Sequence, residues 1–167
     1  MELTYECPAC GKVDRVSPVE TADAVTCPGC GKGRELARGA IEHEGNSATL
    51  RACPWCATED LYLQKDFPHG LGLGIVVAGF VVSSVFWYDY RPVPALAVLL
   101  ATALLDVVLY YLVPDVTICY RCLSQARGAG SSPPGRFAPF DLAVGERYRQ
   151  ERLRVEQLRR GQARPAP

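Results

Sequence analysis

The chain has only two histidines, and neither His43 nor His69 lies at ligand spacing from a cysteine pair. It also has no recognisable pairing of a nucleophile with a base, no phosphate-binding loop and no paired carboxylates. Hydrolases and kinases therefore have no support, and we expect the protein not to be an enzyme. Its formal net charge is zero, so no global field attracts nucleic acid or acidic lipid.

Apolar sequence is scarce outside residues 71–113. Polar segments this short cannot build a large core, and they usually need metal ions or disulfides for stability. Residues 1–6 have no basic region followed by an apolar run, so we expect no signal peptide. Arginine outnumbers lysine 15 to 3, a ratio that favours a GC-rich bacterial source.

Every cysteine of the chain belongs to a Cys-x-x-Cys pair. The pairs are Cys7/Cys10, Cys27/Cys30, Cys53/Cys56 and Cys119/Cys122. The first two pairs are separated by 16 residues and the last two by 62. Without an export signal, thiolates bound to metal in a reducing compartment are favoured over disulfides. We therefore predict two four-cysteine sites with two Zn²⁺ ions per chain, and all-cysteine ligation indicates structural zinc.

The first two pairs repeat one pattern, Cys-Pro-x-Cys-Gly-Lys, at residues 7–12 and 27–32. The glycine after the second cysteine supplies the positive φ angle that such a turn needs. With short strands expected around residues 3–5 and 13–16, residues 1–40 resemble a zinc ribbon. A redox dithiol and an iron site of rubredoxin type are the alternatives. Zinc ribbons occur in proteins of many functions, so this resemblance implies no activity.

The last two pairs follow this pattern less closely. The pair at residues 53–56 has the proline but is followed by Ala57 instead of glycine, and residues 119–122 lack both the proline and the glycine. We predict that residues 41–68 and 114–127 are two halves of a second zinc module, with the membrane hairpin inserted between them. Free thiols at Cys119 and Cys122, or pairing of residues 53/56 with 27/30, are the alternatives. The layout is similar to the LITAF-type zinc domain, although this chain has two apolar stretches and no histidine before its last pair. No LITAF-like role is transferred.

Residues 71–88 and 93–113 are both long and apolar enough to cross a bilayer as helices, and residues 89–92 allow only a tight reversal. The buried helical hairpin of a soluble protein is the alternative. Lys65, Arg121, Arg127 and Arg136 flank the hairpin, against Arg91 alone in its loop. The positive-inside rule then predicts a bacterial inner-membrane protein with both termini in the cytoplasm and the lipid bilayer as a partner.

Asp106 is the one charged residue within the predicted spans. Intramembrane carboxylates are costly and are functional candidates by default. We expect Asp106 to bond to Thr102 or Tyr110, or to join two copies of the hairpin in a homo-oligomer. We also expect the glycines of the first span to allow close helix packing; these are Gly72, Gly74 and Gly79.

The C-terminal arm is predicted to contain a flexible linker over residues 128–140, an amphipathic helix over 141–160 and a disordered tail over 161–167. Asp141 is a plausible N-cap, and residues 144, 148, 155 and 158 form an apolar stripe. Such a helix is either solvated and laced with salt bridges, or held against anionic lipid or a partner protein.

The expected fold is therefore a membrane protein with a two-helix transmembrane hairpin spanning residues 69–113, small β zinc-ribbon modules and a C-terminal amphipathic helix. The favoured function is protein interaction or scaffolding by cytoplasmic zinc ribbons. One alternative is a membrane thiol–disulfide oxidoreductase that uses a Cys-x-x-Cys pair. The other is nucleic-acid binding by the first ribbon, which its offset charges and its single aromatic residue, Tyr5, disfavour.

Overall fold

The computed structural model describes residues 1–44 and 47–162. The chain divides into two compact units. The hairpin unit comprises Lys65–Asp115, and the cysteine-rich unit comprises Met1–Gln64 together with the chain from Val116 onward. The hairpin is therefore an insertion within the cysteine-rich unit.

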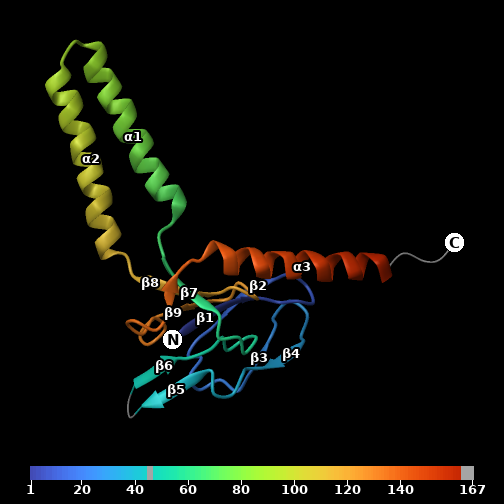
Figure 1. Cartoon of the computed structure of the whole chain (residues 1–167). Coiled ribbons are helices and arrows are strands. Elements are labelled where there is room, and N and C mark those ends of the chain that lie inside the picture. The colour runs from blue at the N-terminus through green and yellow to red at the C-terminus, as the bar shows by residue number, and fades with distance from the viewer. Residues whose placement is uncertain (45–46, 163–167) are drawn as a thin grey trace. The chain divides into compact units, whose positions relative to one another are not determined.

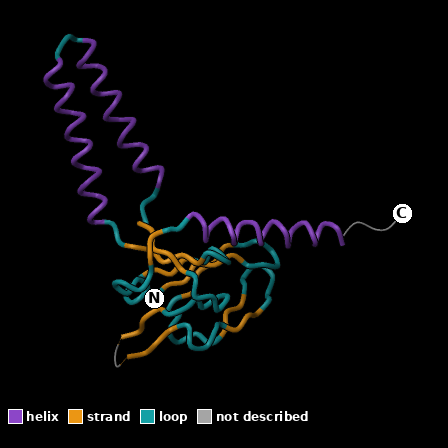
Figure 2. The backbone as a smooth tube through the Cα atoms, in the orientation of Figure 1, coloured by secondary structure: helices purple, strands orange, loops and turns teal. Residues whose placement is uncertain are grey.

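The cysteine-rich unit is built from short strands and one long helix (Figures 1 and 2). The strands are β1 (Glu2–Glu6), β2 (Val13–Val16), β3 (Ala24–Thr26), β4 (Gly33–Glu35), β5 (Ile41–Glu44), β6 (Ser47–Leu50), β7 (Leu61–Lys65), β8 (Asp115–Cys119), β9 (Gln125–Arg127) and β10 (Ala138–Pro139). One sheet has the order β10-β7-β8-β9-β1-β2, while β3-β4 and β5-β6 form separate two-stranded sheets.

The two expected zinc modules share one sheet instead of forming separate domains. Strand β1 pairs with β2 on one side and with β9 on the other, which places Leu3 opposite both Val16 and Ala126. Strand β1 alternates in burial, and the side chains of Leu3 and Tyr5 point into the core. Neither module has enough apolar sequence for a core of its own, so joining them gives both a common core.

Aromatic stacking connects the two modules inside this core. The ring of Tyr5 stacks on that of Trp55 with centroids 4.2 Å apart, and both side chains are buried. The guanidinium of Arg34 lies 4.7 Å from the centroid of the Trp55 ring. The amide of Ala37 also donates to the carbonyl of Pro54 at 2.8 Å. The two modules therefore depend on each other for packing.

The hairpin unit contains α1 (His69–Tyr88) and α2 (Pro92–Leu112), close to the two predicted spans. Both helices are long and apolar enough to cross a membrane. Only 11% and 6% of their most hydrophobic windows are buried within the structure. The described residues therefore do not provide the cover that a helical hairpin would need in a soluble protein.

The two helices meet through small residues and one buried hydrogen bond. Ser83 donates its hydroxyl to the carbonyl of Ala95 at 3.0 Å, and both residues are buried. A Cβ atom at Gly79 would overlap the side chain of Thr102, so this glycine allows close packing as expected. At Gly74 an added Cβ would meet nothing within 4 Å, and the expectation fails there.

Asp106 does not bond to either residue that was expected to satisfy it. Thr102 donates its hydroxyl to the carbonyl of Leu99 at 2.9 Å, and the ring of Tyr110 lies under the ammonium of Lys65. Within residues 1–44 and 47–162, the carboxylate of Asp106 has no hydrogen bond or ion pair, and the residue is half-exposed on α2. That a second copy of the hairpin supplies its partner stays a prediction.

The base of the hairpin is held by polar contacts around Lys65. Its ammonium lies 3.0 Å from the carboxylate of Asp115 and 3.3 Å from the carbonyl of Val113. The amide of Asp66 also donates to the carbonyl of Pro114 at 3.1 Å. These contacts join the segment that precedes α1 to the segment that follows α2.

The segment 128–140 differs from the predicted flexible linker, because it packs against the cysteine-rich unit. The carbonyl of Gly130 accepts from the amide of Leu50 at 2.9 Å, and that of Ser131 accepts from the hydroxyl of Thr117 at 2.7 Å. Gly130 has a φ of 79°, and a Cβ there would overlap the backbone of Ala48. The small residues that suggested flexibility thus serve close packing.

Helix α3 (Leu142–Gln162) agrees with the predicted C-terminal helix. The carboxylate of Asp141 accepts from the amide of Ala143 at 2.7 Å, which confirms the predicted N-cap. Val144 and Tyr148 pack against a buried cluster on the sheet, formed by Tyr62, Val116, Ile118 and Tyr120. The predicted disordered tail lies outside the described residues from 163 onward, while α3 continues to Gln162.

Candidate metal centres

All four cysteine pairs adopt the same local turn. In each turn the backbone of the first cysteine accepts one hydrogen bond and donates another. Its carbonyl accepts from the amide four residues later, and its amide donates to the carbonyl five residues later, at 2.8–3.0 Å in every case. The residue four positions after the first cysteine always has a positive φ angle. These residues are Gly11 (71°), Gly31 (71°), Ala57 (61°) and Leu123 (59°).

The irregular second set of pairs therefore reaches the geometry of the first set without its glycines. Ala57 and Leu123 adopt a left-handed conformation that costs an L-residue roughly 1–2 kcal/mol. Because the backbone bonds are unchanged, both cysteines of each turn still present their sulfurs to one point.

Cluster 1 joins the turn between β1 and β2 to the turn between β3 and β4. The Sγ atoms of Cys7 and Cys30 are 3.7 Å apart, as are those of Cys10 and Cys27. Cluster 2 joins Cys53 and Cys56 to Cys119 and Cys122, with Sγ separations of 3.5 Å for 53–122 and 56–119. In each cluster, all four Sγ atoms lie within 4.8 Å of one another.

These separations fit a tetrahedral metal–thiolate site. Four sulfurs at about 2.3 Å from a central Zn²⁺ ion are about 3.8 Å apart along each edge of the tetrahedron. A disulfide requires about 2.05 Å, and all eight cysteines are free. Each cluster could therefore hold one metal ion, and both are compatible with zinc.

Backbone amides favour the thiolate form that binds metal. Hydrogen bonds from the amides of Ala9 and Cys10 lower the pKa of the Cys7 thiol to about 6. The amide of Gly29 donates to the Sγ atom of Cys27 at 3.4 Å. In cluster 2, Cys53 and Cys119 are buried, so several thiolates there require a cation to offset their mutual repulsion.

A hydroxyl group supports cluster 2 from beside the sulfurs. The Oγ atom of Ser124 is 3.2 Å from the Sγ atoms of both Cys53 and Cys122, and its residue is buried. Ser124 thus contacts one cysteine from each side of the hairpin insertion. A hydroxyl that donates to a ligating sulfur orients that ligand and stabilises its charge.

The eight predicted ligands are all brought together as two groups of four, and the second group unites the two pairs on either side of the hairpin as predicted, in a cluster that could hold a metal ion. The alternative pairing of residues 53/56 with 27/30 is wrong. The described positions of the two clusters contain no histidine.

Neither Ser124 nor the contacts of Lys65 were anticipated. The turn pattern alone does not single out Ser124, because the same position, five residues after the first cysteine, holds Lys12, Lys32 and Thr58 in the other turns.

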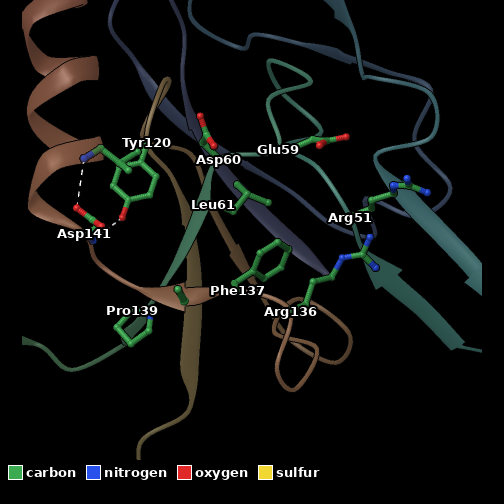
Figure 3. Close-up of a pocket in the computed structure, with 11 residues that line it drawn as sticks. Arg51, Glu59, Asp60, Leu61, Tyr120, Arg136, Phe137, Pro139 and Asp141 are labelled. Carbon is green, nitrogen blue, oxygen red and sulfur yellow. Dashed lines mark hydrogen bonds between the residues drawn. The ribbon is translucent and has the colours of Figure 1, made fainter.

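A cavity of about 410 Å³ lies near the start of α3 (Figure 3). Three of the charged groups on its wall, Arg51, Asp60 and Arg136, pair with their neighbours. Arg51 and Arg136 both contact the carboxylate of Glu42, while Asp60 accepts from Arg147 and from Tyr148. These contacts fix the segment 136–148 on the cysteine-rich unit.

Comparison with known proteins finds no family model, no curated protein and no solved structure that matches the chain.

We expect Ser124→Ala to weaken metal binding at cluster 2 by roughly tenfold, because the hydroxyl that lies 3.2 Å from two of the four sulfurs is lost. The measurement is competition with a chromogenic chelator on the purified full chain. Thr58→Ala is the matched control, since Thr58 occupies the same turn position after Cys53 and its side chain bonds to no sulfur in the described structure. Equal metal release from both variants would contradict this role of Ser124.

Proposed function

We propose that the protein is a zinc-stabilised integral membrane protein that presents its cysteine-rich unit to the cytoplasm for contacts with other proteins. It acts as a binding or scaffolding protein and not as an enzyme. The lipid bilayer is its first partner, and each of its two clusters holds a structural Zn²⁺ ion.

The observation that carries this proposal is the composition of cluster 2. Its four sulfurs come from both sides of the hairpin, and 62 residues separate Cys56 from Cys119. An ion there closes the loop that contains both apolar helices. Structural zinc sites in small modules contribute on the order of 10 kcal/mol to folding, so one ion can stabilise the base of a hairpin whose surface is otherwise apolar.

The charges and the thiols support the same orientation in a bacterial inner membrane. Metal-binding thiolates persist in a reducing compartment, and the hairpin is flanked by Lys65, Arg121, Arg127 and Arg136 but has only Arg91 in its loop. Exposed Trp87, Tyr88 and Tyr90 near that loop suit the opposite membrane interface.

The alternatives have less support. A thiol–disulfide oxidoreductase needs an accessible pair, whereas each sulfur lies in a four-cysteine cluster. Nucleic-acid binding by the first ribbon would use its basic residues, but Arg15 pairs with Glu2 and Arg34 lies over Trp55. These contacts reduce the charge available to phosphate.

The distal part of α3 is the surface that we propose for protein contacts. The apolar stripe that begins with Val144 and Tyr148 against the sheet continues to Val155 and Leu158, which are 44% and 62% exposed. An apolar stripe that continues past its own core is typical of a helix that packs against a partner.

Two zinc ions per chain, about one for each cluster, are expected in protein purified without added metal. Cys53→Ser should lower the content to about one and should lower the melting temperature in detergent more than Cys10→Ser does. The reason is that only cluster 2 closes the loop around the hairpin. Both metal content and melting are measured on the same samples. Retention of two ions in Cys53→Ser, or equal melting of the two variants, would contradict the proposal.

Both ends of the chain should resist external protease in spheroplasts of a bacterial host. A protease site placed after Tyr90 should instead be cut, because two spans put the loop on the opposite side. Immunoblotting of tags at either end provides the readout. Cleavage at the ends with protection of the loop would reverse the proposed orientation.

Leu158→Ser should reduce recovery of a co-purifying protein about tenfold, as expected for an apolar anchor at an interface. Leu153→Ser is the matched control, because Leu153 is 47% exposed but lies off the stripe. Quantitative mass spectrometry after capture in mild detergent compares both variants with the unaltered chain. If the two substitutions have the same effect, the stripe is not the contact surface.

A further inference from the structure

One face of α3 differs from both the sheet-facing side and the distal stripe. Leu142, Arg149 and Arg152 follow one another at helical spacing along this face, together with Gly145. The four residues line a cavity of about 330 Å³, whose floor includes the rings of Tyr62 and Tyr120. The site therefore combines aromatic and aliphatic groups with two guanidinium groups.

Large apolar side chains at this cavity are exposed. Leu142 is 75% exposed, Leu123 is 52% exposed and Phe140 is 51% exposed. The ring of Phe140 is fixed by Tyr62 and Tyr120, with centroid distances of 5.1 and 5.5 Å. These side chains come from the cluster 2 turn and from the start of α3, so they form a fixed apolar patch and not a mobile loop.

The two arginines retain donors for an anionic ligand. Arg152 uses one nitrogen for the carbonyls of Tyr120 and Arg121 at 2.9 and 3.3 Å, which fixes its position. Arg149 donates from its Nη1 atom to the carboxylate of Glu146 at 3.2 Å. Since a guanidinium has five N–H donors, each keeps several for a phosphate oxygen. Two cations face one carboxylate, which leaves a positive surplus.

We propose that this surface, formed by Leu123, Phe140, Leu142, Arg149 and Arg152, binds the headgroup region of anionic phospholipids in the bilayer that the hairpin spans. Arg149 and Arg152 bind the lipid phosphate, and the apolar side chains enter the boundary between headgroups and acyl chains. The inference rests on the proposed membrane insertion of the hairpin.

Two arguments favour lipid over a protein at this surface. Exposed Leu and Phe beside Arg match the layered chemistry of a membrane surface, where apolar groups insert and guanidinium groups contact phosphate. The second argument is the short connection between this surface and the hairpin. Tyr62 precedes the first residue of α1 by seven positions, so the chain between them spans at most about 25 Å. This surface is therefore tethered to the hairpin by a short stretch of chain.

The test uses the full chain with Trp87→Phe, reconstituted in vesicles that contain lipids brominated near the headgroup end of the acyl chain. A tryptophan introduced by Leu142→Trp reports contact with these lipids through quenching. Val13→Trp is the matched control, because Val13 is 61% exposed on β2 of the same unit. A metal content equal to that of the unaltered chain confirms that each variant is folded.

In vesicles with anionic lipid we expect at least about twofold stronger quenching of the Leu142→Trp reporter than of the Val13→Trp reporter. Vesicles of neutral phosphatidylcholine alone should reduce this difference. The double variant Arg149→Gln with Arg152→Gln should also reduce it in anionic vesicles. The double variant Arg149→Lys with Arg152→Lys should retain part of it, because the positive charges remain. Equal quenching of the two reporters, or quenching independent of lipid charge and of the arginines, would overturn the inference.

Alkaline extraction of the same vesicles separates this inference from the proposed function. Release of the chain from the vesicles would contradict membrane insertion itself. Retention of the chain with an unquenched Leu142→Trp reporter would leave insertion intact and overturn only the lipid contact.

Discussion

Four thiolates held within 4.8 Å of one another are stable only around a cation, and the rest of this structure depends on that constraint twice. In cluster 1 a cation would join two turns that are close in sequence. In cluster 2 it would join two segments with 62 residues between them. A soluble protein could satisfy that spacing with an inserted domain, but here the insertion is a pair of apolar helices. Within the hairpin unit, the contacts of Lys65 with Asp115 and Val113 join the segment before α1 to the segment after α2.

The two clusters are not independent modules. Strand β1 pairs with both β2 and β9, and Tyr5 stacks on Trp55 between the two clusters. Two large aromatic side chains buried in a shared core stabilise both halves of that core. Replacing a buried Trp or Phe with Ala typically lowers the free energy of unfolding by about 3–5 kcal/mol. Loss of one ion should then be felt at the other cluster through the core. This coupling explains how so little apolar sequence supports a folded unit.

Much of this arrangement could be predicted from residue spacing. The eight ligands, the two apolar helices and the Asp141 cap all follow from local patterns, because turns, spans and caps depend on neighbouring residues. Features that depend on contacts between distant segments could not be predicted. Ser124 reads as an ordinary turn residue until the fold places it between Cys53 and Cys122. Likewise Gly130 and Ser131 have the composition of a linker, and only the neighbouring backbone of Ala48 shows why small residues are needed.

Helix α3 illustrates how one element can have separate roles along its length and around its circumference. Its first turns are fixed by the Asp141 cap, by Tyr148 against Asp60 and by Arg152 against the carbonyl of Tyr120. These contacts lie on one side of the helix, between its cap and Arg152. Most of the stability of a helix in a protein comes from packing of one face and not from intrinsic propensity. The packed first half of α3 therefore favours helix formation in the second half, where Val155 and Leu158 are exposed.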